Sequence, residues 1–330
     1  MKLCAYCKNI LGTPQHAKTD EHIIPASLIN LFPEQDITYN CNKIYVDNRG
    51  VTISDVCQTC NNGFLSALDS YGKNIITEYF YKPFEYKDYN TPFSIKLDSD
   101  LFTRWILKII YNEQRSNNIE NSVINSSIPF IRGLNNQCPN NISIFLGIHI
   151  NLNPIPEEYF SYWPLQINKN LIFEYFSFSE RTNTHKRLIL PENTCSYAIR
   201  FASCIVLVIL WDDIISQNEK ENIVSELITH FRFTELHSDI NQYTIRCVSS
   251  PENVWLFNYR IFFSESAVHD TLTMIKKSIQ NRDIGEAQKD FCKQWTKEFN
   301  AKGRALNELS LFPDNAKKKK QYEKYWKKKE

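Results

Sequence analysis

The chain has 330 residues, of which 42% are hydrophobic and 13% aromatic. This length and composition are enough for a sizeable core and indicate two domains. The formal net charge of +1 excludes a uniformly basic protein that binds nucleic acid through its overall charge. The most hydrophobic run, FASCIVLVILW (201–211), is shorter than the roughly 20 residues that span a bilayer. It therefore predicts a buried strand or a core helix.

Cysteine usage points to metal binding. The first residues, MKLCAYCKNIL, lack the charged and apolar regions of a secretory signal, so we expect a cytoplasmic protein with no membrane partner. Ten cysteines in such a chain favour metal binding over disulfides, because four of them form two CxxC pairs. The pairs are Cys4 with Cys7 and Cys57 with Cys60. Four thiolates suit a tetrahedral structural zinc site. The alternative is that one or both pairs are ordinary buried or loop cysteines.

Residues 1–74 have the composition of a small module that a metal stabilises, being rich in Cys, Asn and turn residues. The stretch TDEHIIPASL (19–28) sets Glu21 directly before His22. Successive side chains of a strand point to opposite faces, so this pair can serve two different purposes. A helix is predicted to begin after Cys60, because apolar residues recur there at helical spacing.

The rest of the chain predicts a larger α+β domain of unassigned topology over residues 75–312. Residues 99–116 should form an amphipathic helix that Ser99 caps. The polar side of this helix carries Arg104, Lys108, Asn112 and Arg115. Further strands are predicted at 142–150, 171–179 and 243–249, and further helices at 218–231 and about 265–301. The final segment, 313–330, is a Lys-rich tail of a kind that is usually solvated.

The order of the N-terminal motifs resembles the HNH endonuclease superfamily. The likeness is closest to its cysteine-bearing branch, which includes the endonuclease VII type of junction resolvase. The shared pattern is CxxC, then an acidic residue and His before an apolar stretch, then a second CxxC followed directly by Asn. It covers about residues 1–72 and implies a ββα-metal fold that cuts nucleic-acid phosphodiester bonds with one divalent cation.

The resemblance assigns a role to each matching residue. It implies structural zinc on Cys4, Cys7, Cys57 and Cys60. It implies Glu21 and Asn61 as ligands of a catalytic Mg²⁺ or Mn²⁺ ion and His22 as the general base. These residue types suit phosphodiester hydrolysis, because hard cations prefer oxygen ligands and histidine accepts a proton near neutral pH. The acidic position is more often Asp or His in the family, and only Thr52 or Asn48 falls near the place of its middle asparagine.

We therefore expect a metal-dependent DNA endonuclease, of the restriction or antiphage defence type, that its C-terminal part or a partner controls. Candidate partners are an Argonaute-like guide-binding protein, a nucleotide signal and further copies of the chain. Candidate contacts to DNA or RNA are Arg104, Lys108, Lys317, Lys318, Lys319 and Lys320. Alternatively these lysines and arginines only face water. The alternative function is a non-catalytic zinc adaptor for nucleic acid or protein, which would not require Glu21, His22 and Asn61.

Overall fold

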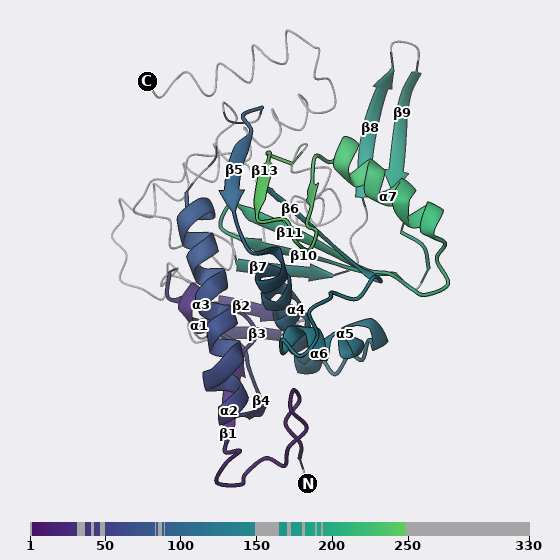
Figure 1. Cartoon of the computed structure of the whole chain (residues 1–330). Coiled ribbons are helices and arrows are strands. Elements are labelled where there is room, and N and C mark those ends of the chain that lie inside the picture. The colour runs from purple at the N-terminus through teal and green to yellow at the C-terminus, as the bar shows by residue number, and fades with distance from the viewer. Residues whose placement is uncertain are drawn as a thin grey trace.

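The described part of the chain forms a mixed α+β fold, as predicted, and its sheets are antiparallel (Figure 1). A computed structural model describes residues 2–31, 37–40, 43–46, 50–82, 84, 88, 90–148, 165–169, 173–179, 182–188, 190–192 and 194–248. The helix predicted at 265–301 and the tail at 313–330 lie outside these residues. No helix within the described ranges combines the length and the apolar character that crossing a bilayer requires.

The N-terminal part consists of short strands followed by a helical stretch that is kinked at Gly63. Its elements are β1 (Lys18–His22), α1 (Ala26–Ile29), β2 (Ile37–Asn40), β3 (Lys43–Val46), β4 (Thr52–Cys57), α2 (Gln58–Cys60), η1 (Asn61–Leu65), α3 (Ser66–Ile75) and η2 (Ile76–Phe80). β1 pairs antiparallel with β4, and β2 with β3. The predicted helix thus begins at Gln58, before Cys60, and continues across the domain boundary expected near residue 75.

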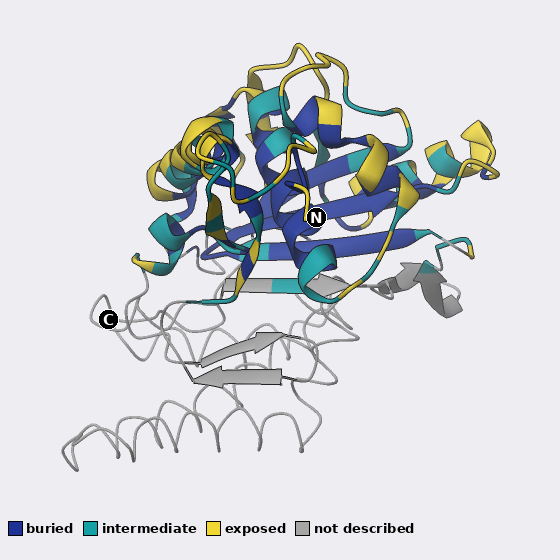
Figure 2. Ribbon diagram, turned by 90° about the horizontal axis from the view of Figure 1, so that it is seen from below, coloured by how far each residue is buried: buried dark blue, intermediate teal, exposed yellow. Residues whose placement is uncertain are grey.

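A five-stranded antiparallel sheet forms the centre of the fold. In spatial order it contains β12 (Thr234–Glu235), β6 (Ile142–Ile148), β11 (Cys204–Leu210), β10 (Cys195–Phe201) and β7 (Leu165–Lys169). The apolar run at 201–211 therefore starts at the end of β10, turns at 202–203 and continues as the strand β11, each residue of which is buried. The long strands at the centre of Figure 2 are correspondingly dark blue. Alternate residues of β11 belong to two separate cores, which shows that both faces of the sheet are covered.

The remaining elements agree with most of the predicted ranges. They are β5 (Phe93–Lys96), α4 (Ser99–Ser116), α5 (Ser122–Ser126), α6 (Ile128–Ile131), β8 (Phe173–Ser179), β9 (Thr182–Leu188), α7 (Gln217–Thr229) and β13 (Gln242–Ile245). The predictions for β6, β8 and α7 are confirmed to within a few residues. β13 ends at Ile245, earlier than the predicted residue 249, and pairs with β5.

α4 matches the predicted helix at 99–116, but its cap lies one residue earlier. The Asp98 carboxylate accepts a hydrogen bond from the Leu101 amide at 2.9 Å and so caps the first turn. The Ser99 hydroxyl instead donates to backbone oxygens of His237 and Ile240 at 2.7 and 2.9 Å. Ser99 therefore attaches α4 to the segment that leads into β13.

α4 lies between the central sheet and the N-terminal part, so both of its sides are covered. Trp105 packs on Phe201 of β10, with the two ring centroids 5.5 Å apart. The other side of the helix contacts α3 and β4. The alternative that the basic residues of this helix only face water is therefore wrong for Lys108, which is 0% exposed. Asn112 on the same side of the helix is also 0% exposed.

The contact between α3 and α4 depends on a glycine. A Cβ atom at Gly72 would lie 2.1 Å from a ring atom of Trp105, which is fully buried and cannot move aside. We expect Gly72→Ala to lower the free energy of unfolding by about 1–3 kcal/mol, although alanine is the better helix former by about 1 kcal/mol. Urea unfolding measures the difference. The exposed Asn74→Ala on the same helix should be neutral or slightly stabilising, and equal stability of both variants would contradict this packing.

Candidate metal centre and the Glu21–His22 strand

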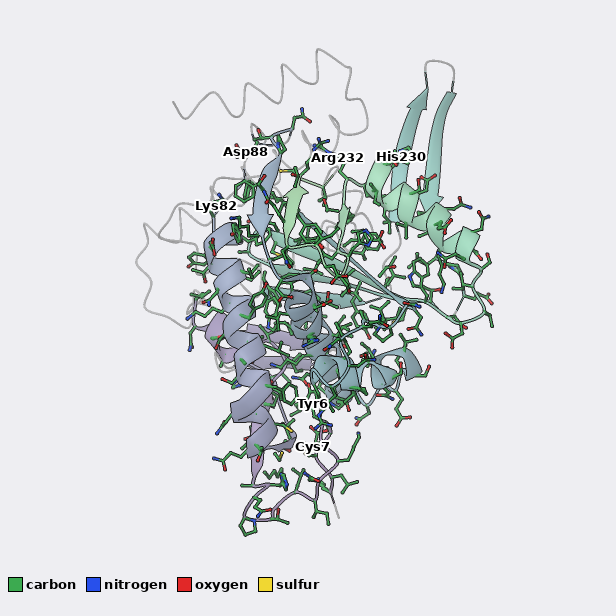
Figure 3. All side chains as sticks on the ribbon, viewed as in Figure 1. Tyr6, Cys7, Lys82, Asp88, His230 and Arg232 are labelled. Carbon is green, nitrogen blue, oxygen red and sulfur yellow. The ribbon has the colours of Figure 1, made fainter. Side chains whose placement is uncertain are left out.

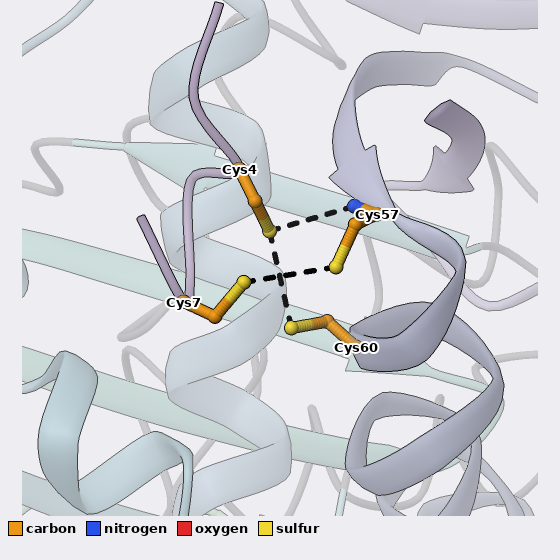
Figure 4. Close-up of side chains that lie close together, drawn as sticks. All are labelled: Cys4, Cys7, Cys57 and Cys60. Atoms are coloured by element: carbon orange, nitrogen blue, oxygen red, sulfur yellow. Dashed lines mark hydrogen bonds between the residues drawn. The ribbon is translucent and has the colours of Figure 1, made fainter. Parts of the chain in front are cut away.

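The two CxxC pairs come together as one cluster. The sulfur atoms of Cys4, Cys7, Cys57 and Cys60 all lie within 4.8 Å of one another (Figure 4). The Cys4 and Cys60 sulfurs are 3.9 Å apart, and the Cys7 and Cys57 sulfurs are 3.7 Å apart. Tetrahedral zinc with Zn–S bonds of about 2.3 Å places its sulfur ligands about 3.8 Å apart. The spacing is therefore that of a structural Zn²⁺ site.

Local backbone structure brings each pair into place. Cys4 begins a tight turn in which the Lys8 amide donates to the Cys4 carbonyl oxygen at 2.9 Å. Cys57 ends β4 and Cys60 lies in the helix that follows, so a strand-to-helix transition presents the second pair. The Cys57 amide also donates to the Cys4 sulfur at 3.4 Å, which joins the two pairs directly.

The electrostatics of the cluster favour a bound cation. Burial and the nearby Cys4 raise the pKa of the Cys60 thiol. Burial also acts to raise the pKa of Cys4, but hydrogen bonds from backbone amides, Cys7 first, outweigh it and lower the pKa to about 7. Four thiolates at these distances repel one another unless a cation lies among them. Sulfur ligands in tetrahedral array are the set that zinc prefers.

The other cysteines of the described ranges do not join this site. Within those ranges, the four N-terminal cysteines are the group of metal-ligating side chains close enough together to share an ion. Cys138, Cys195, Cys204 and Cys247 lie elsewhere in the fold and form no disulfide. Burial raises the pKa of each of Cys138, Cys204 and Cys247, which disfavours the thiolate form that binds metal.

Asn61 connects the cysteine cluster to the strand that carries Glu21 and His22. Its side-chain nitrogen donates to the Thr19 hydroxyl at 3.1 Å and to the Asp20 carbonyl oxygen at 3.0 Å. Because Asn61 directly follows Cys60, these bonds hold the start of the helical stretch against β1. The structure thus brings the predicted residues Asn61, Glu21 and His22 into one small region.

Glu21 and His22 differ in their environments. The β1–β4 register shifts between Thr19 and Glu21, which marks a bulge. Beyond this bulge the Glu21 side chain is 4% exposed, whereas His22 is half-buried. Of the two candidates for the family's middle asparagine, Thr52 lies opposite His22 in the β1–β4 register. Asn48 lies outside the described residues.

The Glu21 carboxylate forms a buried ion pair with α4. Its Oε1 atom lies 2.5 Å from the Lys108 ammonium nitrogen, and Asn112 Nδ2 donates to the same oxygen at 3.3 Å. The Lys108 ammonium also contacts both Asp69 carboxylate oxygens, each at 2.8 Å. One ammonium from α4 is therefore shared between carboxylates from β1 and α3.

Asn112 extends this network to the first cysteine turn. Asn112 Nδ2 donates to the His22 carbonyl oxygen at 3.1 Å, and Asn112 Oδ1 accepts from the Tyr6 hydroxyl at 2.6 Å. Figure 3 shows Tyr6 and Cys7 close together in the lower part of the view, far from Lys82 and Asp88. Burial raises the pKa of Tyr6 well above its usual value, so its hydroxyl stays a donor. The turn of the cysteine cluster, the Glu21–His22 strand and α4 are thus connected by hydrogen bonds.

The present arrangement does not fit a catalytic divalent ion at Glu21. The Glu21 carboxylate is buried, and the Lys108 ammonium already balances its negative charge. Asn61 directs its side-chain nitrogen toward β1. A hard cation would bind the side-chain oxygen, Oδ1, which is therefore not the atom that Asn61 directs toward β1. Burial also raises the pKa of Asp69, an effect that the adjacent Lys108 ammonium opposes.

The basic residues expected to touch nucleic acid have different environments. Lys108 is fully buried, so in this structure it presents no charge to a phosphate backbone. Arg104 is half-buried, with its guanidinium carbon 4.9 Å from the ring centre of Phe130. The lysines at 317–320 lie outside the described residues.

Asn112 and Tyr6 were not among the predicted site residues. A signal for Asn112 was nevertheless present, because Leu101 lies three and seven residues before Arg104 and Lys108 and so falls on the polar side of the helix at 99–116. An apolar residue on that side indicates a helix that is covered all round, whose polar residues then need buried partners.

Comparison with known proteins does not add a family to these observations. The chain matches no protein family, no curated protein and no solved structure. The functional interpretation therefore depends on the motifs and on the geometry of the residues themselves.

The cysteine cluster predicts the zinc content of the protein. We expect about one zinc ion per wild-type chain and markedly less in Cys57→Ala, because that variant removes one ligand of the cluster. Elemental analysis measures zinc, and limited proteolysis should find the N-terminal residues of the variant more sensitive. Cys204→Ala, which removes a buried thiol from β11, should keep full zinc content. Full zinc in Cys57→Ala would show that the cluster is not the site.

Proposed function

We propose that the chain is a metal-dependent endonuclease of the HNH type, with a ββα-metal unit near its N-terminus. The observation that carries the proposal is the pair of hydrogen bonds from Asn61 to β1. They join the cysteine cluster and the helical stretch to the strand of Glu21 and His22. A zinc cluster that served only as a structural staple would not require these three residue types beside it.

The order of elements supports the same proposal. β1 and β4 form an antiparallel pair, and the helical stretch follows β4 directly. The second CxxC lies at the junction between this pair and the helix, where a zinc ion would fix both. The ββα arrangement and the place of the cysteines are those that the resemblance implies.

His22 is the proposed general base. His22 is half-buried, whereas its neighbour Glu21 is buried, so the two side chains have different environments. The bond from Asn112 to the His22 carbonyl oxygen holds the main chain of the histidine in place. In this role His22 takes a proton from the attacking water. A divalent ion, when bound, would neutralise charge on the phosphate.

The proposed substrate is DNA, with RNA as the second candidate, and the proposed setting is restriction or antiphage defence. The larger part of the chain is proposed to control cleavage, either by itself or with a partner. α4 gives a physical route for such control, because it contacts both the central sheet and the Glu21–His22 strand. Arg104 remains a candidate contact to the nucleic acid.

A non-catalytic zinc adaptor is the second candidate function. The ion pair between Glu21 and Lys108 favours it, because a neutralised, buried carboxylate is not a ready metal ligand. An adaptor would bind nucleic acid or protein without cleaving it. The two functions therefore differ in what happens to a bound substrate.

A cleavage assay on the zinc-loaded protein tests the proposal. Plasmid, single-stranded DNA and RNA are incubated with and without Mg²⁺ or Mn²⁺. We expect metal-dependent cleavage that falls by at least about 100-fold in His22→Ala, because the base is lost. Zinc content and the unfolding midpoint of this variant should stay unchanged.

His237→Ala is the matched control, since His237 is an exposed histidine on the segment after β12. Its activity should equal that of the wild type. Wild-type turnover in His22→Ala would refute the base assignment. Substrate binding without cleavage under every metal condition would favour the adaptor.

A further inference from the structure

The acidic residue before the proposed base has a partner other than a metal ion. We propose that Glu21 is a positioning residue, whose carboxylate is held by Lys108 of α4 and fixes the strand segment that carries His22. In this role Glu21 does not ligate the catalytic divalent ion. The inference rests on the proposed function, and it departs from the role that the resemblance implies for Glu21.

α4 holds both residues of the Glu21–His22 pair. The Lys108 ammonium lies 2.5 Å from Glu21 Oε1, which is the distance of a short charge-assisted bond. Asn112 Nδ2 donates to the same oxygen at 3.3 Å and to the His22 carbonyl oxygen at 3.1 Å. Lys108 and Asn112 are four residues apart and so lie on one face of α4. This face therefore contacts the side chain of Glu21 and the main chain of His22.

Strand pairing by itself gives β1 limited support at this point. The β1–β4 register shifts between Thr19 and Glu21, and such a bulge leaves a residue unpaired and bends the strand. Beyond the shift, Glu21 lies opposite Ile53 and His22 opposite Thr52, and β1 ends at His22. The paired segment that carries the base is therefore short. The contacts with α4 add the support that the ladder lacks.

The environment of Glu21 suits an anchor better than a metal ligand. The Glu21 side chain is 4% exposed, and Lys108 and Asn112 both present N–H donors to its oxygen. A buried carboxylate and a buried ammonium are each unfavourable unless they are paired. The same ammonium lies 2.8 Å from both Asp69 oxygens, so the contact also attaches α3. A neutral hydrogen-bond acceptor at position 21 should therefore preserve the anchor, whereas a metal ligand needs the negative charge.

Glu21→Gln and Glu21→Met form a matched pair that separates the two roles. Gln has the length of Glu and still accepts from Lys108 and Asn112, whereas Met has a similar length and only a weakly accepting sulfur. Zinc-loaded full-length protein is assayed for plasmid cleavage against Mn²⁺ concentration and for hydrogen–deuterium exchange of β1. We expect Glu21→Gln to stay within about threefold of the wild type in kcat and in the Mn²⁺ concentration for half-maximal cleavage.

Glu21→Met should lower kcat at least about tenfold, because a misplaced base loses rate, and should change KM and the half-maximal Mn²⁺ concentration by less than about twofold. The amides of β1 should exchange faster in this variant. Lys108→Met removes the other partner and should produce the same changes. Lys73→Met on α3 is the matched lysine control and should behave as the wild type.

The outcomes distinguish this inference from the proposed function. A rise of at least about tenfold in the Mn²⁺ requirement of Glu21→Gln would identify Glu21 as a metal ligand and overturn the inference. Unchanged exchange of β1 in both Glu21→Met and Lys108→Met would also overturn it. If the wild type cleaves nothing with any metal, while β1 exchanges faster in Glu21→Met and not in Glu21→Gln, the nuclease is refuted and the anchor is confirmed. Should Glu21→Met not fold, the Mn²⁺ response of Glu21→Gln decides between the two roles.

Discussion

The buried ammonium of Lys108 imposes the constraint on which the N-terminal part of the fold depends. A charge that is 0% exposed must be paired, and removing one partner of such a pair costs about 3–5 kcal/mol. Lys108 belongs to α4, whereas its partners Glu21 and Asp69 belong to β1 and α3. These three elements must therefore assemble together. As a result the Glu21–His22 strand is fixed by a helix that also packs on the central sheet.

The cysteine cluster and the ion pair act on the same strand from two directions. A structural zinc ion can supply on the order of 10 kcal/mol of folding free energy, and here it would fix the ends of β4 and the first turn. Asn61 transmits that constraint to β1 through its bonds to Thr19 and Asp20. Tyr6 transmits it to α4 through its bond to Asn112. The surroundings of Glu21 and His22 are therefore set by both the cysteine cluster and the larger part of the chain.

The features that depend on local sequence could be predicted, and those that depend on distant contacts could not. CxxC spacing predicted the cysteine cluster, and apolar periodicity predicted the helix at 99–116 to the residue. The sequence did not decide whether the run at 201–211 forms a strand or a helix, because a segment that is buried on both faces shows no periodicity. The burial of Lys108 was missed because its partner Asp69 is 39 residues away, and Asn112 bonds to Glu21 across 91 residues.

We infer that α4 joins the cysteine cluster and the central sheet into one cooperative unit. Hydrogen–deuterium exchange with mass spectrometry, on the zinc-loaded protein and after zinc removal, tests it most directly. After zinc removal we expect the amides of α4 to lose protection together with those of β1 and β4, because the bonds through Tyr6, Asn112 and Lys108 are lost with the cluster. Full protection of α4, with exchange increased only in residues 2–60, would contradict it.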